Sequence, residues 1–194
     1  MWSSPLFWIA VSIAAFWALG AYNRLMRLRS AVVQAFGSFD AHVVRQLALL
    51  SEFGAVHEAA LHPAGTGMGR EMAALQGAAT QLSASLAVAR ARPLRKDAVA
   101  ALAAARDVLH TTWDKAARSV HAPAGAPAPI DTEAPQAQPV LRSPWDARWN
   151  EHMQQNAQAI SVFNDAVQHY NTAIAQFPAN LLARAFGFKA ARGL

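Results

Sequence analysis

The sequence predicts an all-α protein: an N-terminal transmembrane helix that continues into a long antiparallel up-down helical bundle. Three observations lead to this fold class. Residues 1–23 contain no charged side chain, alanine is abundant in the remaining chain, and apolar residues recur there at steps of three and four, as on one face of a helix. Runs of alternating β-branched residues, which indicate strands, are few.

A membrane anchor is expected over residues 1–22. A helix that spans a bilayer needs about 20 mostly apolar residues, and Leu6–Ala21 is an uncharged, mostly apolar run. Aromatic rings, which favour the two membrane–water interfaces, lie toward both ends of this segment: Trp2, Trp8, Trp17 and Tyr22. The pattern therefore predicts a helix that crosses the membrane.

The orientation of the anchor follows from the charges around it. A cleaved signal peptide is the alternative, because Ala18-Leu19-Gly20 has the small-x-small form of a cleavage site. However, no basic residue precedes the apolar run, and Arg24, Arg27 and Arg29 follow it. By the positive-inside rule, we expect a single-pass protein of the bacterial inner membrane with its N-terminus outside and its C-terminal domain in the cytoplasm. The lack of cysteine is compatible with either compartment.

Residues 23–121 are expected to form the first three helices of the bundle. The anchor helix should continue to about Leu61, with one apolar face made of Leu25, Leu28, Val32, Phe36, Phe39, Val43, Leu47, Leu50 and Phe53. The segment His62–Gly67 interrupts it. A second helix is predicted over Met68–Ala91 and a third over Leu94–His121, separated by Pro93. Their expected buried residues are Met72, Leu75, Ala79, Leu82, Leu86 and Ala89 in the second, and Val99, Leu102, Leu109, Trp113 and Val120 in the third.

A proline-rich segment separates these helices from the last one. Residues 122–144 contain six prolines among alanine and polar residues, which predicts an extended or disordered linker. The closing helix is expected over residues 145–178, after the cap candidate Ser143. Its apolar and aromatic seam includes Trp145, Trp149, His152, Asn156, Ile160, Phe163, Val167, Tyr170, Ile174 and Phe177. Asn164 and Asn171 recur beside this seam and are expected to hydrogen-bond across helices, which would fix their register as in a coiled coil.

The C-terminal segment resembles the signature of the LemA family. That signature has two YN heptads, then FPxN and FGF; the corresponding residues here are Phe163, Asn164, Tyr170, Asn171, Phe177, Pro178, Asn180, Phe186, Gly187 and Phe188. The pattern that follows the family's anchor is also present in Tyr22, Asn23 and Asp40. The middle helices depart from the family pattern, so the chain resembles a divergent member. The resemblance implies a single-pass membrane protein with a helical bundle, and neither catalytic residues nor a cofactor.

The remaining motifs give no strong sign of an active site. His57 and His62 are five residues apart, whereas a zinc-protease helix needs histidines at i and i+4. The glycines of Gly65–Arg70 lack the lysine and the preceding strand of a phosphate loop. With no cysteine and no clustered carboxylates, the ingredients of acid–base or covalent catalysis are not assembled. We expect no enzyme activity, no metal and no cofactor.

The charge distribution points to the membrane surface. The net charge is +5, and basic residues gather between Arg90 and Lys96 and in the tail, residues 179–194. In an anchored chain this pattern favours anionic lipid over nucleic acid. An up-down bundle would return the tail to the bilayer, where it should act as an interfacial amphipathic helix. The expected membrane-surface residues are Arg24, Arg27, Arg29, Leu182, Arg184, Phe186, Phe188 and Lys189.

These observations predict a non-catalytic membrane scaffold or adaptor. Its expected partners are the lipid bilayer and an unidentified membrane or cytoplasmic protein. A second copy of the chain is a further candidate partner, which would make the protein a homo-oligomer. The alternative function is an accessory factor or degenerate enzyme associated with envelope proteolysis. A third hypothesis, nucleic-acid binding through the Arg90–Lys96 cluster, requires steeply salt-dependent affinity and is less favoured.

Overall fold

The computed structural model describes residues 5–58, 67–121, 143–177 and 179–194. This part of the chain is mainly helical and contains no strand, which confirms the predicted all-α class. The helices are α1 (Pro5–Glu58), α2 (Gly67–Ala91), α3 (Lys96–His121), α4 (Pro144–Ala175) and α5 (Ala179–Ala185). The expected end of the first helix near Leu61, and residues 122–142 of the expected linker, lie outside the described residues.

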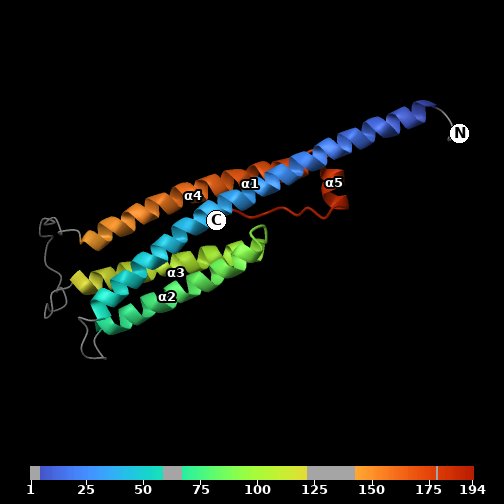
Figure 1. Ribbon diagram of the computed structural model, residues 1–194. Coiled ribbons are helices and arrows are strands. Elements are labelled where there is room, and N and C mark those ends of the chain that lie inside the picture. Colours follow the sequence, from blue (N-terminus) through green and yellow to red (C-terminus); the bar gives the residue numbers. More distant parts are fainter. Residues whose placement is uncertain (1–4, 59–66, 122–142, 178) are drawn as a thin grey trace, which may run out of the picture.

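The four long helices form an up-down bundle (Figure 1). α1 packs mainly against α4, and α2 packs mainly against α3, while α1 and α2 join the two pairs. Because α4 runs opposite to α1, it brings α5 back to the N-terminal part of α1. The first turns of α1 extend beyond the bundle, and the end of the bundle from which they project is called the anchor end below.

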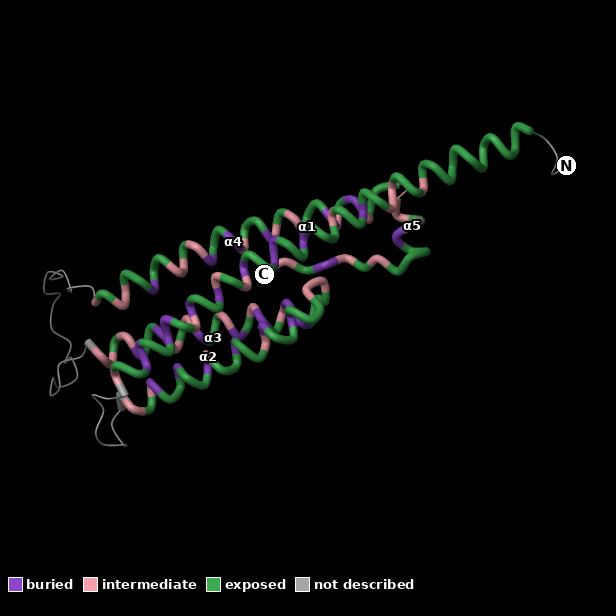
Figure 2. The backbone as a smooth tube through the Cα atoms, viewed as in Figure 1, coloured by how far each residue is buried: buried purple, intermediate pink, exposed green. Residues whose placement is uncertain are grey.

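α1 is one continuous helix with two different surfaces. Its N-terminal part is exposed on all sides (Figure 2), including Leu6 and Phe16, which are 75% and 77% exposed. From Leu25 onward, the side chains at the predicted steps are buried or half-buried in the bundle, as at Val32 and Phe39. Among the described helices, α1 is the one that is long and apolar enough to cross a membrane. A fully exposed apolar helix end is what a lipid environment requires.

The turn between α2 and α3 is short because proline cannot continue the helix. Two backbone hydrogen bonds close it, from Arg92 N to the Ala89 carbonyl (3.1 Å) and from Arg95 N to the Arg92 carbonyl (3.0 Å). α3 then begins at Lys96, slightly later than the sequence predicts. This tight connection keeps α2 and α3 in antiparallel contact and places a basic turn at the anchor end.

Aromatic rings fill the core at the opposite end of the bundle. Trp113 on α3 stacks on Trp149 of α4, with ring centroids 4.5 Å apart and planes inclined by 15°. Phe53 on α1 lies 4.9 Å from Trp113 and 5.5 Å from Trp145. One cluster therefore joins three helices, and its two central tryptophans, Trp113 and Trp149, are almost completely buried.

α4 begins as the sequence predicts and ends earlier. Ser143 caps it, because the Ser143 hydroxyl accepts a hydrogen bond from Trp145 N at 3.2 Å. The helix ends at Ala175, and Phe177, expected on the buried seam, is 80% exposed. The seam expectation is therefore wrong at Phe177, since the helical periodicity that would place its ring in the core stops two residues before it.

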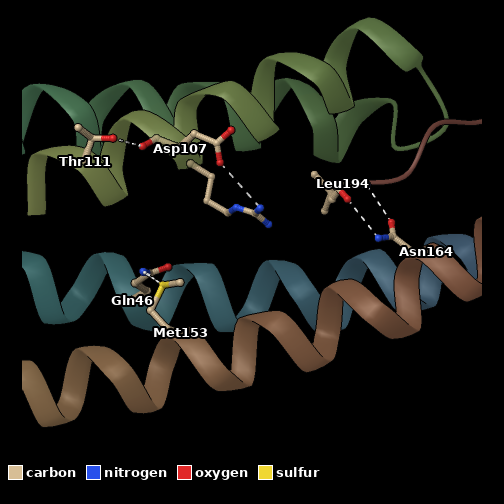
Figure 3. Close-up of polar contacts among 7 residues, drawn as sticks. Gln46, Asp107, Thr111, Met153, Asn164 and Leu194 are labelled. Carbon is tan, nitrogen blue, oxygen red and sulfur yellow. Dashed lines mark hydrogen bonds and ion pairs between the residues drawn. The ribbon is translucent and has the colours of Figure 1, made fainter. Parts of the chain in front are cut away.

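The buried polar contact between α1 and α4 comes from residues other than the two predicted asparagines, and an exposed ion pair between Arg148 and Glu52 also joins these helices. Asn156 Nδ2 donates to Gln46 Oε1 at 2.6 Å. Gln46 Nε2 in turn approaches Met153 Sδ at 3.6 Å (Figure 3). Both amides are buried. Gln46 was not expected in the core, because its neighbour Leu47 is apolar and also fits the helical spacing of the buried face.

Separate and joint replacement of Gln46 and Asn156 should give non-additive changes in stability. Asn156→Leu alone leaves the Gln46 amide buried without its partner, at a cost of about 1–3 kcal/mol. Gln46→Leu alone should cost a similar amount, whereas the double variant should cost much less than the sum. Chemical unfolding of the full chain measures the coupling. Additive losses would contradict a direct interaction.

Candidate functional site

The C-terminal tail returns to the anchor end and is only partly helical. α5 ends in a left-handed turn at Gly187, where φ is +70°. Phe188 N donates to the Ala183 carbonyl at 2.8 Å and Gly187 N approaches the Arg184 carbonyl at 3.4 Å, the two bonds of a Schellman cap. The expectation that the whole tail forms an amphipathic helix is therefore wrong. Glycine terminates the helix because it adopts positive φ without steric cost.

After Gly187 the tail runs back along α4 as a non-helical strap, residues 188–194 (Figure 1). The side chain of Asn171 makes two hydrogen bonds to the backbone of Ala191: Nδ2 donates to the carbonyl at 3.0 Å, and Oδ1 accepts from the amide at 2.9 Å. Asn164 binds Leu194 in the same way, at 3.1 and 2.9 Å; Figure 3 shows this pair. The Tyr170 hydroxyl donates to the Lys189 carbonyl at 3.1 Å. The asparagines of the two heptads therefore bind the tail backbone, and not a neighbouring helix as expected.

The spacing of the two asparagines matches the geometry of the strap. Seven residues of α-helix rise about 10.5 Å, and three residues of extended chain span about 10 Å. Asn164 and Asn171 are seven residues apart, while Ala191 and Leu194 are three apart. A Cβ atom at Gly193 would clash with the Asn164 side chain, so this position needs glycine for close approach. The heptad spacing thus sets the register between α4 and the strap.

Aromatic side chains join the tail to the beginning of the bundle. Tyr22 on α1 lies 5.2 Å from Phe186 and 6.2 Å from Phe188, measured between ring centroids. Phe188 is half-buried against the core, while Phe186 and Leu181 are 61% and 59% exposed. With the exposed Phe177, these residues form an apolar rim beside the point where α1 leaves the bundle.

The predicted membrane-surface residues lie around this rim, and the structure separates their roles. Arg24 and Arg27 are exposed on α1, and Arg184 and Lys189 are exposed on the tail. Leu182 is half-buried. Arg29 lines a cleft together with Phe186, Phe188 and Lys189.

That cleft has a volume of about 630 Å³ and opens between the α2–α3 turn and the tail. Its basic lining residues are Arg29, Arg95, Lys96 and Lys189, and its one acidic lining residue is Asp97. Arg95 Nε donates to Asp97 Oδ1 at 2.8 Å, and this hydrogen bond lowers the pKa of Asp97 to about 2. The cleft therefore keeps an excess of positive charge at neutral pH.

Another family-motif residue, Asp40, has a structural partner on a neighbouring helix. Asp40 on α1 accepts from Arg90 Nε of α2 at 2.6 Å, so this motif aspartate ties α2 to α1. Two arginines of the predicted basic cluster, Arg90–Lys96, are therefore paired with carboxylates: Arg90 with Asp40, and Arg95 with Asp97. Asn23 is exposed, Asn180 is half-buried, and Pro178 lies outside the described residues.

Three of the histidines, His57, His110 and His152, are partly buried in the bundle. His57 Nδ1 is 2.8 Å from the Phe53 carbonyl, and the ring packs against Phe53 and Trp145; His62 lies outside the described residues. Burial lowers the pKa of His110, which packs edge-on against Trp149, and burial also lowers the pKa of His152. In the part of the chain that the structure describes, no three histidine or carboxylate side chains come together as metal ligands.

Comparison with known proteins supports the sequence resemblance. The model of the LemA family matches residues 150–193, which include most of α4, all of α5 and nearly the whole strap. No curated protein and no solved structure matches the chain. The matched segment carries the two asparagines, the glycine turn and the tail that they hold. The match to the LemA family thus lies in the segment where the tail packs against α4.

Proposed function

We propose that this protein is a non-catalytic, single-pass membrane protein of the LemA type that acts as a helical scaffold or adaptor at the bacterial inner membrane. The observation that carries the proposal is the return of the tail to α1. Phe186 and Phe188 contact Tyr22 at the end of the apolar segment, with Arg24 and Arg27 nearby in the sequence. Exposed aromatic and basic side chains at one level suit a membrane–water interface.

The structural part played by the polar motif residues supports the scaffold role. The polar motif residues Asp40, Asn164 and Asn171 hold helices and the strap together. The long sides of the bundle remain available to a membrane or cytoplasmic protein. In the proposed topology, α1 projects the bundle into the cytoplasm, because the arginines after the apolar segment stay on that side.

Protease treatment of spheroplasts tests the proposed orientation. An epitope tag inserted in the proline-rich segment, residues 122–142, avoids the strap, whose last residue is hydrogen-bonded to Asn164. The tag should be protected in intact spheroplasts and digested after lysis, and the protein should stay in membranes washed with alkaline carbonate. The same tag fused ahead of residue 1 should be digested without lysis. The reverse pattern would place the bundle outside the cytoplasm, and loss from washed membranes would rule out a spanning anchor.

A further inference from the structure

The cleft at the anchor end brings together three cations that form no ion pair with the described part of the chain. Arg95 is paired with Asp97, but no ion pair forms at Arg29, Lys96 or Lys189 within the described ranges. These three side chains come from α1, α3 and the strap, and they line one cleft of about 630 Å³. Like charges that converge from three separate segments repel one another, so an anion in the cleft would stabilise the arrangement.

The cleft is also amphipathic. Leu94, Tyr170, Phe186 and Phe188 line it together with the cations. Phe186 is largely exposed and lies at the rim. A small inorganic anion would use the cations alone, whereas a ligand with a phosphate and an adjoining apolar part would use both kinds of surface. The lining therefore matches a phospholipid better than a free ion.

The position of the cleft along α1 fits the same ligand. Arg29 follows Tyr22 by seven residues, which is about 10 Å along a helix. The polar head-group layer extends about 5–8 Å beyond the hydrocarbon core on each side. The edge of this layer therefore lies about 2–5 Å from the level of Arg29 along the helix, a gap that the long arginine side chain spans. Basic sites close to the cytoplasmic surface attract anionic lipid.

We propose that the cleft lined by Arg29, Lys96 and Lys189 binds the phosphate group of an anionic phospholipid from the bilayer that holds α1. This inference rests on the proposed function, because it requires the anchor end to face a membrane. The guanidinium of Arg29 can contact two phosphate oxygens at once, and the two ammonium groups supply further charge-assisted hydrogen bonds. The bound head group would link α1, the α2–α3 turn and the strap.

Native mass spectrometry of the full chain in detergent tests the site, with phosphatidylglycerol as the probe and phosphatidylcholine as the zwitterionic comparison. One phosphatidylglycerol should bind more tightly than the others and at least tenfold more tightly than phosphatidylcholine. The variant Arg29→Gln/Lys96→Gln/Lys189→Gln should lose at least tenfold in affinity for that molecule. The matched control Arg70→Gln/Lys115→Gln/Arg118→Gln removes the same charge from exposed positions near the opposite end and should change the affinity less than twofold.

Equal losses in the two variants would overturn the proposal, since net charge alone would then explain binding; unchanged affinity in the cleft variant would overturn it directly.

Competition with soluble glycerol phosphate distinguishes the source of the phosphate. Displacement of the lipid by an equal concentration of glycerol phosphate would overturn the lipid assignment, and failure to displace it supports the assignment. The tag-protection experiment tests the orientation independently, so loss of the cleft site with an intact protection pattern contradicts this inference alone.

Discussion

The double variant Asn164→Ala/Asn171→Ala is expected to release the strap from α4 and to lower the free energy of unfolding by roughly 2–4 kcal/mol. The two side chains make four hydrogen bonds to the backbone of Ala191 and Leu194, and each is worth about 1 kcal/mol net. Hydrogen exchange measures the release directly, because the amides of Ala191 and Leu194 are donors in these bonds. Their protection should fall sharply, while protection in α2 and α3 should be retained.

Two further variants separate the strap from a general effect on α4. Asn150→Ala changes an exposed asparagine on the same helix and should leave the tail protected. Gly193→Ala leaves both asparagines intact but introduces a Cβ against the Asn164 side chain, so it should expose the Leu194 amide first. If the double variant kept full protection at Ala191 and Leu194, the strap would not depend on these side chains.

Trp113→Ala should destabilise the bundle by about 3–5 kcal/mol, the cost of deleting a large buried ring. Trp113 is 2% exposed and contacts Trp149 and Phe53, so the deletion leaves a cavity shared by three helices. Aromatic pairs contribute a further 0.5–1.5 kcal/mol or so beyond their buried area. Chemical denaturation followed by circular dichroism measures the loss.

The matched control for Trp113 is Val108→Ala, because Val108 lies on α3 and is 43% exposed. It should cost less than about 0.5 kcal/mol, as surface substitutions commonly do. The near-ultraviolet circular dichroism signal of the stacked tryptophans should be lost in Trp113→Ala and retained in Val108→Ala. A loss below about 1 kcal/mol in Trp113→Ala would mean that the ring is not an essential part of the core.

The long helices were predictable because burial repeats along them. Leu25, Val32, Phe39, Val43 and Phe53 are buried as the steps of three and four predict, and the uncharged stretch before them remains exposed. The same periodicity failed at Phe177, since a pattern of side chains does not show where the backbone hydrogen bonds stop. Gln46 was missed because an adjacent leucine satisfied the pattern equally well.

The site was only partly predictable, because its organisation depends on non-local contacts. The sequence indicated that Asn164 and Asn171 are paired by a heptad, but a heptad does not say whether the partner is a helix or an extended chain. The difference is visible only when Ala191 and Leu194 lie opposite them. Gly187 carried a usable signal, since a glycine after a short apolar segment is a common helix terminator. The cleft gave none, as its cations come from distant parts of the chain.

In the proposed topology, the unbroken helix α1 makes the bundle a rigid arm that pivots at the bilayer. From Tyr22 to Glu58 the helix has no interruption, and at about 1.5 Å per residue this arm is roughly 54 Å long. Transmembrane helices tilt by about 20° on average, and a change of that size would sweep the far aromatic end through roughly 18 Å. In the proposed topology, small changes in bilayer thickness or lateral pressure would therefore become large displacements at the distance where a cytoplasmic partner meets the bundle.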